Sequence, residues 1–167
     1  MQSQFPDARL IVLDTIDLYV REYRPKLLEA IAGAHGLVIN DWEATQLTGE
    51  GDATEAAQKL LGLGPRFAIV KRGDHGAVLA HPEAMWHCPA YPVKDLVDPT
   101  GAGDSFLGGF LGYMAEHNAD ADHFAAIQQA MCHGTAAASF TIEDFSPRRL
   151  AKVTRKQIDE RVAELDC

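Results

Sequence analysis

Residues 97–106 read Val97-Asp98-Pro99-Thr100-Gly101-Ala102-Gly103-Asp104-Ser105-Phe106, a loop of small residues that opens onto an apolar helix. The first N–H groups of a helix have no partner within it, and they carry the positive end of the helix dipole. Glycines lack a Cβ atom, so an anion can approach that backbone closely. The loop is therefore predicted to bind an anion at the start of the helix.

Asp104 stands at the start of the same helix, where a carboxylate would repel a bound anion unless it takes part in a reaction. A base that removes a proton from an attacking hydroxyl would have this placement, beside N–H groups that stabilise the charge of the transferred group. The alternative is that Asp104 is only the N-cap of the helix. Both interpretations stay open at this point.

Short apolar runs alternate with helical patterns along the rest of the chain. Strands are predicted over residues 9–14, 37–39, 67–71, 77–80 and 85–87. Helices are predicted over residues 22–34, 41–47, 53–61, 105–116, 124–140 and 154–165. The first two strands contain continuous apolar runs, residues 10–13 and 37–39, as expected for strands buried on both faces, and the last two strands can pair back as antiparallel strands. This order indicates a layered α/β sheet with an antiparallel edge.

The composition bounds the class of protein. With 167 residues, 47% of them apolar and 23% charged, the chain can bury one sizeable core, and we expect a single domain. The 15 Lys and Arg against 24 Asp and Glu give a net charge of -9, so we expect no nucleic-acid partner. No apolar run approaches the roughly 20 residues of a membrane span, and the N-terminus lacks a signal pattern. We therefore expect a cytoplasmic protein without a membrane partner.

The cysteines and histidines are scattered along the chain. Cys88, Cys132 and Cys167 form no C-x-x-C pair, so a disulfide framework is not expected, and they are interpreted as small apolar side chains and one frayed terminal residue. No two of the seven histidines have the i, i+4 spacing of a zinc site on a helix. A structural zinc site is therefore not expected.

Three motifs, in this order, resemble those of the ribokinase-like (PfkB-type) carbohydrate kinases. Residues 40–43, Asn-Asp-Trp-Glu, resemble the N-x-x-E motif of that family, and residues 71–76, Lys-Arg-Gly-Asp-His-Gly, resemble its nucleotide-site turn. Residues 98–110 are close to its C-terminal signature. The resemblance implies a three-layer sandwich, with a mostly parallel central sheet, antiparallel edge strands and flanking helices.

The resemblance also implies roles for the loop. Asp104 would be the catalytic base that deprotonates a substrate hydroxyl. The anion hole for the γ-phosphoryl group of ATP would be formed by the backbone N–H groups of Gly101, Ala102 and Gly103. Some relatives hold a monovalent cation beside the anion hole, near the positions of Asp98 and Thr100. The segment that would complete that site, residues 139–145, lacks the glycine common in the family, so potassium dependence stays open.

Asn40 and Glu43 would, by the same resemblance, help to hold Mg²⁺ and its water shell. The pair also fits a capping box, with Asn40 as the N-cap and Glu43 three residues later. The resemblance also implies that the nucleotide is contacted by Arg72, Gly73, Gly76, Thr100 and His133. For Arg72 the alternative is a solvated charge at a strand end, and for His133 it is a buried histidine whose ring is satisfied within the protein.

The resemblance covers residues 9–144, but only the C-terminal, ATP-binding half of the family pattern. The chain, residues 1–167, is therefore expected to form a partial kinase domain. The implied function is ATP-dependent transfer of the γ-phosphoryl group to a hydroxyl of a sugar or nucleoside. The alternative is a non-catalytic nucleotide-binding fragment or interaction module that lacks the acceptor site and lid. An apolar surface left where the other half would dock predicts self-association or a second chain that supplies that half.

Overall fold

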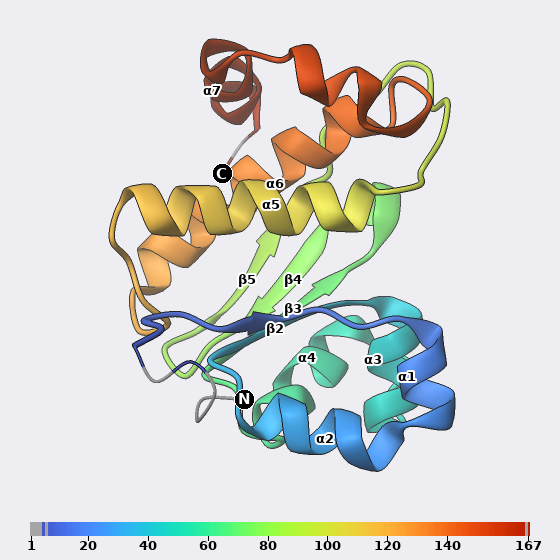
Figure 1. Cartoon of the computed structure of the whole chain (residues 1–167), viewed down its shortest axis with the longest axis vertical. Coiled ribbons are helices and arrows are strands. Elements are labelled where there is room, and N and C mark those ends of the chain that lie inside the picture. The colour runs from blue at the N-terminus through green and yellow to red at the C-terminus, as the bar shows by residue number, and fades with distance from the viewer. Residues whose placement is uncertain (1–4, 6, 166) are drawn as a thin grey trace. The chain divides into compact units, whose positions relative to one another are not determined.

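The computed structural model describes residues 5, 7–165 and 167 (Figure 1). Its residues group into two compact units. The sheet unit comprises Met1–Arg72, Ala77–His87 and Asp120–Phe124, and the helical unit comprises Gly73–Gly76, Cys88–Ala119 and Ala125–Cys167. The single partial domain stays a prediction. In the described part of the chain, no helix combines the length and apolar character that crossing a membrane requires.

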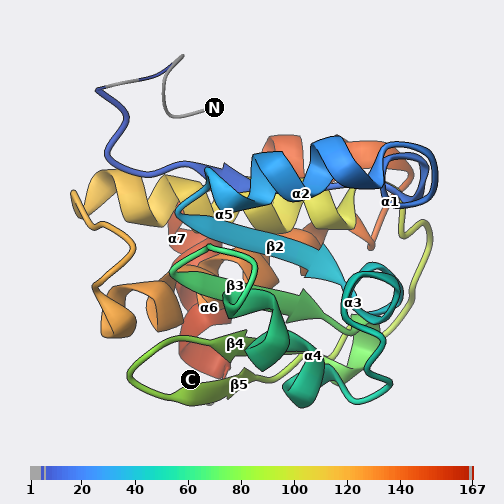
Figure 2. The ribbon, with the colours of Figure 1, turned by 90° about the horizontal axis from the view of Figure 1, so that it is seen from below.

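The sheet has five strands in the order β1-β2-β3-β4-β5 (Figure 2). Their bounds are Val12–Leu13, Gly36–Asn40, Phe67–Lys71, Ala77–Ala80 and Met85–Cys88. The first three are parallel to one another, and β4 pairs antiparallel with β3. The mixed sheet and the antiparallel return after residue 71 are confirmed. β1 is shorter than the predicted strand over residues 9–14.

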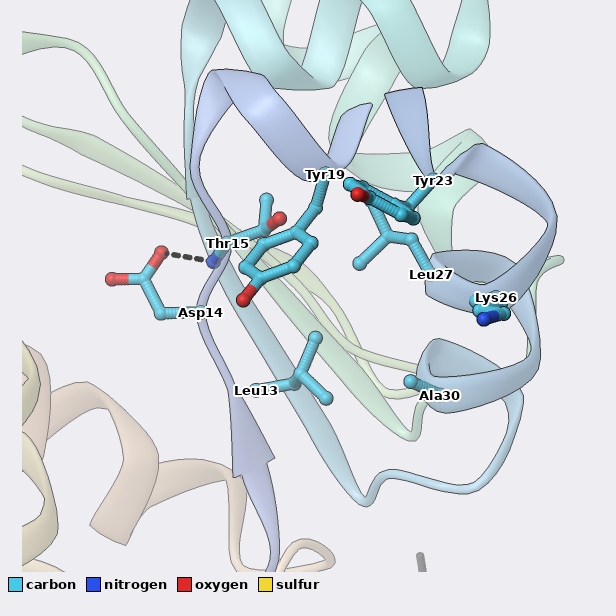
Figure 3. A pocket seen from close by; sticks show the side chains of 8 residues that line it. All are labelled: Leu13, Asp14, Thr15, Tyr19, Tyr23, Lys26, Leu27 and Ala30. Atoms are coloured by element: carbon cyan, nitrogen blue, oxygen red, sulfur yellow. Dashed lines mark hydrogen bonds between the residues drawn. The ribbon is translucent and has the colours of Figure 1, made fainter. Parts of the chain in front are cut away.

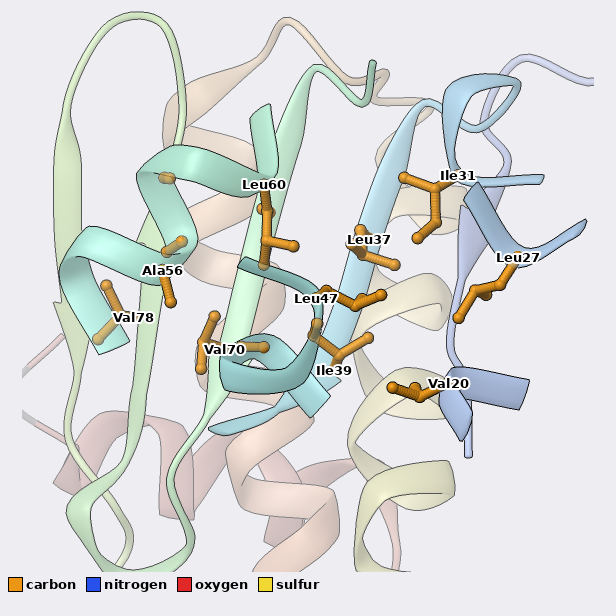
Figure 4. Close-up of a cluster of buried hydrophobic side chains, with 14 residues drawn as sticks. Val20, Leu27, Ile31, Leu37, Ile39, Leu47, Ala56, Leu60, Val70 and Val78 are labelled. Atoms are coloured by element: carbon orange, nitrogen blue, oxygen red, sulfur yellow. The ribbon is translucent and has the colours of Figure 1, made fainter. Parts of the chain in front are cut away.

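Two helical crossovers join the parallel strands, as such connections require. Helices α1 (Asp17–Glu22) and α2 (Arg24–Ala32) lie between β1 and β2, and helices α3 (Asp41–Thr48) and α4 (Ala53–Leu61) lie between β2 and β3. All four contribute side chains to one buried cluster on one face of the sheet (Figure 4). The strands contribute alternate residues to it, namely Leu37, Ile39, Ala68, Val70, Val78 and Ala80. Val38 and Ile69, which lie between them, are also 0% exposed, so β2 is buried on both faces as predicted, and so is β3. The same prediction is wrong for β1, whose two residues are only partly buried.

The ends of α3 and α4 follow from local chemistry. Gly49 ends α3 in the left-handed conformation, with a φ of 78°, which glycine adopts without strain. Asp52 begins α4 as its N-cap, because its Oδ1 accepts hydrogen bonds from the N–H groups of Thr54 and Glu55 at 2.8 and 3.0 Å. Both signals were readable in the sequence.

The predicted helix over residues 22–34 is wrong in its bounds. The structure has two helices, α1 and α2, separated at Tyr23, whose φ of −127° and ψ of 25° are not helical. Pro25 lies in the first turn of α2. Proline has no N–H to donate and its ring clashes with a preceding helical turn, so a helix can begin with proline in its first turn but does not continue through it from earlier residues.

The helical unit contains α5 (Ala102–Glu116), most of α6 (Phe124–Thr141) and α7 (Arg155–Glu164), with 3₁₀ turns η2 (Gly73–His75), η3 (Ser146–Arg148) and η4 (Leu150–Lys152). Phe106, Phe110 and Met114 form the buried stripe of α5, as predicted. The backbones of α5 and α6 approach closely: a Cβ on Gly109 would lie 2.7 Å from the carbonyl oxygen of His133, and one on Gly134 would lie 2.7 Å from that of Phe106.

This close approach predicts a sharp difference between two neighbouring glycines of α5. Gly109→Ala is expected to destabilise the protein by about 1–3 kcal/mol, because the new methyl group must push the α6 backbone away. Gly108→Ala is the matched control. Nothing lies within 4 Å of a Cβ at Gly108, so this change is expected to stabilise the helix by about 0.5–1 kcal/mol. Denaturant unfolding of both variants tests the pair, and equal stabilities would contradict the described packing.

Two of the three cysteines are paired in the structure. Cys132 in α6 and Cys167 form a disulfide, whereas Cys88 is a free, buried thiol. The expectation of unpaired cysteines is therefore wrong for this pair. The two residues are 35 positions apart in the sequence and meet only through the packing of the helical unit, which the spacing of cysteines cannot reveal.

Candidate active site

The loop before α5 ends in a glycine with a left-handed backbone conformation. Gly101 is the N-cap of α5 and has a φ of 82°, a left-handed conformation that favours glycine. The Oδ1 of Asp98 accepts a hydrogen bond from the N–H of Thr100 at 3.0 Å, and this bond lowers the pKa of Asp98. Ile142 accepts hydrogen bonds at its carbonyl oxygen from the N–H groups of Val97 and Asp98. The segment after α6 thus fixes the start of the loop.

Asp104 is the third residue of α5, not its N-cap. The helix begins at Ala102, three residues before the predicted start, because Gly101 supplies the turn and the small residues that follow continue as helix. Among the described residues, no side chain caps this helix end. The exposed carboxylate of Asp104 therefore lies in the first turn of α5. At this helix start the backbone N–H groups are not capped by a described side chain.

The first-turn N–H groups differ in their bonding. Ala102 donates its N–H to the carbonyl oxygen of Pro99 at 3.1 Å, and Ser105 donates its N–H to that of Gly101 at 2.9 Å. The hydroxyl of Thr141 donates to the Oγ of Ser105 at 2.7 Å, which links the end of α6 to the first turn of α5. The predicted anion-hole residues and Asp104 are thus brought together within the helical unit.

Asn40 and Glu43 are brought together in the sheet unit, where β2 ends and α3 begins. The Oδ1 of Asn40 accepts a hydrogen bond from the N–H of Glu43 at 2.8 Å, and the Oε2 of Glu43 accepts one from the N–H of Asn40 at 2.9 Å. This is a complete capping box. The capping alternative therefore describes part of what the pair does, whatever else it binds.

A charged cluster surrounds this pair at the carboxyl ends of the parallel strands. Asp14 follows β1, Lys71 ends β3, and the Nζ of Lys71 lies 3.1 Å from the Oδ2 of Asp14. Lys71 is also the register partner of Asn40. From the sequence, Asp14 was taken only as a strand end and Lys71 as a strand end that opens the nucleotide-site motif, although the carboxyl edge of parallel strands is where such sheets bind ligands. That rule was the signal available to find them.

Glu43 is 2% exposed, and burial raises the pKa of its carboxyl group above the ordinary value of 4.5. The hydrogen bond from Asn40 and the charge of Lys71 lower the pKa, and the charges of Asp14 and Asp17 raise it. Because the folded protein holds this proton more tightly than the unfolded chain does, the protein loses stability as the pH rises from about 4.5 through the raised pKa. A bound cation would offset that loss.

A groove of about 440 Å³ opens beside β1 in the sheet unit (Figure 3). Tyr19 and Tyr23, two of its lining residues, are 49% and 47% exposed. Asp14 also lines it and accepts a hydrogen bond at Oδ1 from the N–H of Thr15 at 2.8 Å. The groove was not predicted from the sequence, because its wall includes residues of α1, a helix that was not predicted either. The whole lining consists of Leu13, Asp14, Thr15, Tyr19, Tyr23, Lys26, Leu27 and Ala30.

The predicted nucleotide turn contains two glycines with positive φ, 58° at Gly73 and 78° at Gly76. A Cβ on Gly76 would lie 2.1 Å from the carbonyl oxygen of Cys88, so this position has no room for a side chain. Arg72, which precedes the turn, is partly buried in the sheet unit, where its charge contributes to lowering the pKa of Asp52. Hydrogen bonds from the N–H groups of Glu55 and Thr54 are the larger causes of that lowering.

His133 has partners for both ring nitrogens within the helical unit. Its Nδ1 lies 2.9 Å from the carbonyl oxygen of Gln129, and its Nε2 lies 3.6 Å from the Oδ1 of Asp159 in α7. The ring also packs against Tyr113, with 4.5 Å between the ring centroids. The ring of His133 is therefore buried, with one hydrogen bond at Nδ1 and a carboxylate near Nε2, and an adenine contact at His133 stays a prediction.

Known proteins resemble the chain over most of its length. The family model described as pfkB family carbohydrate kinase matches residues 8–152. A cytidine kinase from Thermococcus kodakarensis is 38% identical over 112 residues, which are 64% of this chain and 40% of that protein. An aminoimidazole riboside kinase from Salmonella typhimurium is 36% identical over 100 residues, which are 60% of this chain and 30% of that protein.

A solved structure also matches the fold. The aminoimidazole riboside kinase from Salmonella enterica, crystallised with aminoimidazole riboside and an ATP analog, superposes with a TM-score of 0.78 at 26% identity. The match covers 92% of this chain and 52% of that one, so the chain spans about half the length of that kinase and less of the two curated relatives. The predicted partial ribokinase-like fold is confirmed. On the family match over residues 8–152, the chain belongs to the pfkB family of carbohydrate kinases.

Proposed function

We propose that the chain supplies the ATP side of a kinase that transfers the γ-phosphoryl group to a hydroxyl of a sugar or nucleoside. One observation carries the proposal: Asp104 places an exposed carboxylate in the first turn of α5, whose N-terminus is formed by a glycine in the left-handed conformation and small residues. The two curated relatives described above, which are kinases of nucleosides by name, support the substrate class.

Asp104 is the proposed base. Its carboxylate accepts the proton of the acceptor hydroxyl as the hydroxyl oxygen forms a bond to the γ-phosphorus. The bond between that phosphorus and the oxygen bridging to the β-phosphate breaks, and its electron pair leaves with ADP. Its exposure leaves the carboxylate open to an acceptor hydroxyl that arrives from solvent.

The backbone N–H groups of Gly101, Ala102 and Gly103 are the proposed anion hole, where they offset the charge that the transferred group carries. Ala102 already donates to the carbonyl oxygen of Pro99, so its N–H must leave that bond or share it when a phosphate is present. Gly101 and Gly103 therefore carry the larger share in this proposal. Thr100, Gly73, Gly76 and Arg72 remain proposed nucleotide contacts on the strength of the family motifs.

Asn40 and Glu43 are the proposed magnesium residues. The donor set fits the ion, because Mg²⁺ prefers oxygen ligands and the pair offers a carboxylate and an amide oxygen. Burial and the carboxylates of Asp14 and Asp17 raise the pKa of Glu43, which means that they destabilise its ionised form. A bound cation would stabilise that ionised form. When bound, Mg²⁺ neutralises phosphate charge, while Asn40 and Glu43 hold its water shell and the start of α3 together.

Glu43→Gln is expected to raise the magnesium concentration needed for half-maximal activity by about 10- to 100-fold, the loss usual when a group that supports a metal site is removed. Glutamine can still accept the hydrogen bond from the N–H of Asn40, so the capping box should survive. Glu55→Gln is the matched control, because Glu55 is also the third residue of a capped helix but is exposed. An unchanged magnesium titration with a lowered melting temperature would leave Glu43 with a capping role alone.

The competing function is a nucleotide-binding module without catalysis. Both functions predict ATP binding, and only a kinase transfers phosphate. The decisive experiment incubates the protein, completed with the other half of the kinase domain, with γ-labelled ATP and a panel of sugars and nucleosides. Label in a phosphorylated acceptor supports the kinase. ATP binding without transfer to any acceptor would favour the binding module.

The groove beside β1 is the proposed docking face for that other half. β1 is an edge strand of only two residues. Shortly after it in the sequence come Ile16 and Leu18, whose apolar side chains are 55% and 50% exposed. Exposed apolar surface at a strand edge favours pairing with another segment. The solved kinase is about twice as long as the matched region, so a segment of the right size exists in the family.

A further inference from the structure

All three cysteines of the chain meet at one place in the helical unit. Cys88 ends β5, Cys132 lies in α6, and Cys167 follows α7, yet the three sulfur atoms lie within 4.8 Å of one another. Cys88 and Cys132 are 1% and 0% exposed, whereas Cys167 is exposed. The disulfide joins Cys132 to Cys167 and leaves Cys88 as the third sulfur beside it.

We propose that, when this disulfide is reduced, the three cysteines form a binding site for a soft, thiophilic cation of the zinc class. The disulfide uses only Cys132 and Cys167, so it does not explain why the thiol of Cys88 lies beside them. Thiolates about 2.3 Å from a tetrahedral ion lie about 3.8 Å from one another, so sulfur atoms within 4.8 Å need to move only slightly to share one. Three thiolates also favour a soft ion over Mg²⁺ or Ca²⁺, which prefer oxygen ligands.

The surroundings of the sulfur atoms suit such a site. The sulfur of Cys88 lies 3.4 Å from the hydroxyl oxygen of Thr135, and the sulfur of Cys132 lies 3.2 Å from the carbonyl oxygen of Gln128, to which its thiol can donate once the disulfide is reduced. Thr135 lies one turn after Cys132 on α6, so its hydroxyl can donate to a thiolate at Cys88 and orient it. Cys167 opens the site to solvent, which gives access to an ion and to a reductant and supplies a water as the fourth ligand.

The two chemical steps balance. Reduction of the disulfide consumes one equivalent of an external dithiol, which becomes a cyclic disulfide, and leaves two protein thiols at Cys132 and Cys167. Binding of one divalent cation then replaces three thiol protons by three sulfur–metal bonds and releases three protons to solvent. The disulfide and the metal complex exclude each other, because both use the sulfur atoms of Cys132 and Cys167.

Either state ties the residues after α7 to α6. Other contacts also join these two helices: Arg161 of α7 donates to the Oγ of Ser139 at 2.7 Å, and Asp159 approaches His133. Arg161 also packs over the ring of Phe140, 3.4 Å from its centroid. The reduced protein without metal keeps these contacts but loses the covalent or metal link, so we expect bound metal to raise its melting temperature.

The test uses the 167-residue chain reduced with dithiothreitol, freed of reductant under anaerobic conditions and titrated with Cd²⁺ as a spectroscopic probe and with Zn²⁺ by calorimetry. We expect one ion per chain, a thiolate-to-cadmium absorption band, three protons released and three thiols protected from a thiol reagent. The oxidised protein, with one free thiol, is expected not to bind. Cys88→Ser and Cys167→Ser are each expected to weaken binding by at least about 100-fold.

Cys167→Ser keeps the test valid if Cys88→Ser does not fold, because Cys167 is exposed and its replacement leaves the core intact. Reduced protein with three reactive thiols that binds neither ion would overturn the proposal. So would a Cys88→Ser variant that binds as tightly as the wild type with only two protons released, since this would show a site made by Cys132 and Cys167 alone.

Discussion

Asp104→Asn is expected to lower phosphoryl transfer by about 100- to 10,000-fold in the completed kinase, the range usual for loss of a general base. Asparagine keeps the size of the side chain in the first turn of α5 but cannot accept the proton of the acceptor hydroxyl. Binding of ATP should change little, because removal of a negative charge near the proposed anion hole does not weaken a phosphate contact. The loss should therefore appear in kcat rather than in the affinity for ATP.

Single-turnover transfer from labelled ATP measures the Asp104 effect without a contribution from product release. Asp95→Asn is the matched control, because Asp95 is an exposed carboxylate in the segment before the same helix and has no place in the proposed machinery. A rate in the Asp104→Asn variant within a few-fold of the wild-type rate would remove Asp104 from the role of base. An equal loss in Asp95→Asn would show that net charge, not the position of the carboxylate, matters.

The second large effect concerns the 167-residue chain on its own, which is expected to show no sugar or nucleoside kinase turnover and only weak ATP binding. Transfer requires the acceptor hydroxyl to be held in line with the γ-phosphorus, and a displacement of about 1 Å can already cost about 100-fold. The solved kinase that matches the chain is about twice as long as the matched region, and the rest of that length has no counterpart here.

Self-association is expected to accompany this loss of activity. Among the described residues, the short strand β1 forms one edge of the sheet, and the exposed side chains of Ile16, Leu18 and Tyr19 add apolar surface. Light scattering and a coupled assay of ADP release, run over sugars and nucleosides, test both parts. A monomer with ordinary turnover would contradict the account and would require an acceptor site within these residues.

The sequence predicted those parts of the fold in which local and tertiary preferences agree. The strands at Phe67–Lys71 and Ala77–Ala80 and the helix at Ala53–Leu61 have the predicted bounds. Their apolar patterns are clear, and the helix has two possible caps at its start, Asp52 and Thr54, and glycines after it. The structure selects Asp52 as the cap. Consistent signals of this kind specify an element without help from the rest of the chain.

The errors lie where a local signal was weak or had two meanings. The helix predicted over residues 22–34 corresponds to α2, which begins two residues later with Pro25 in its first turn, and the six-residue helix α1 before it was missed. The start of α5 was placed at Ser105, because Gly101, Ala102 and Gly103 look like a loop by composition. In the structure Ala102 and Gly103 are helical, which moves Asp104 into the first turn.

The candidate site was predictable in its motifs but not in its surroundings. Asn40 and Glu43 were found from their spacing, and the structure joins them in a capping box. The charges of Asp14 and Lys71 reach Glu43 only because three parallel strands end at one edge. The cysteine cluster is likewise a product of tertiary packing, since its members come from three separate elements.

The most direct test of the central claim follows the backbone N–H signals of Gly101, Ala102 and Gly103 by NMR. The chain is titrated with Mg²⁺ and a non-hydrolysable ATP analog, and then separately with Mg²⁺ and ADP. If these N–H groups form the anion hole, their signals should shift strongly with the triphosphate and much less with the diphosphate, because only the former carries a γ-phosphate. Equal shifts with both nucleotides, or nucleotide binding that leaves these three signals unmoved, would contradict the account.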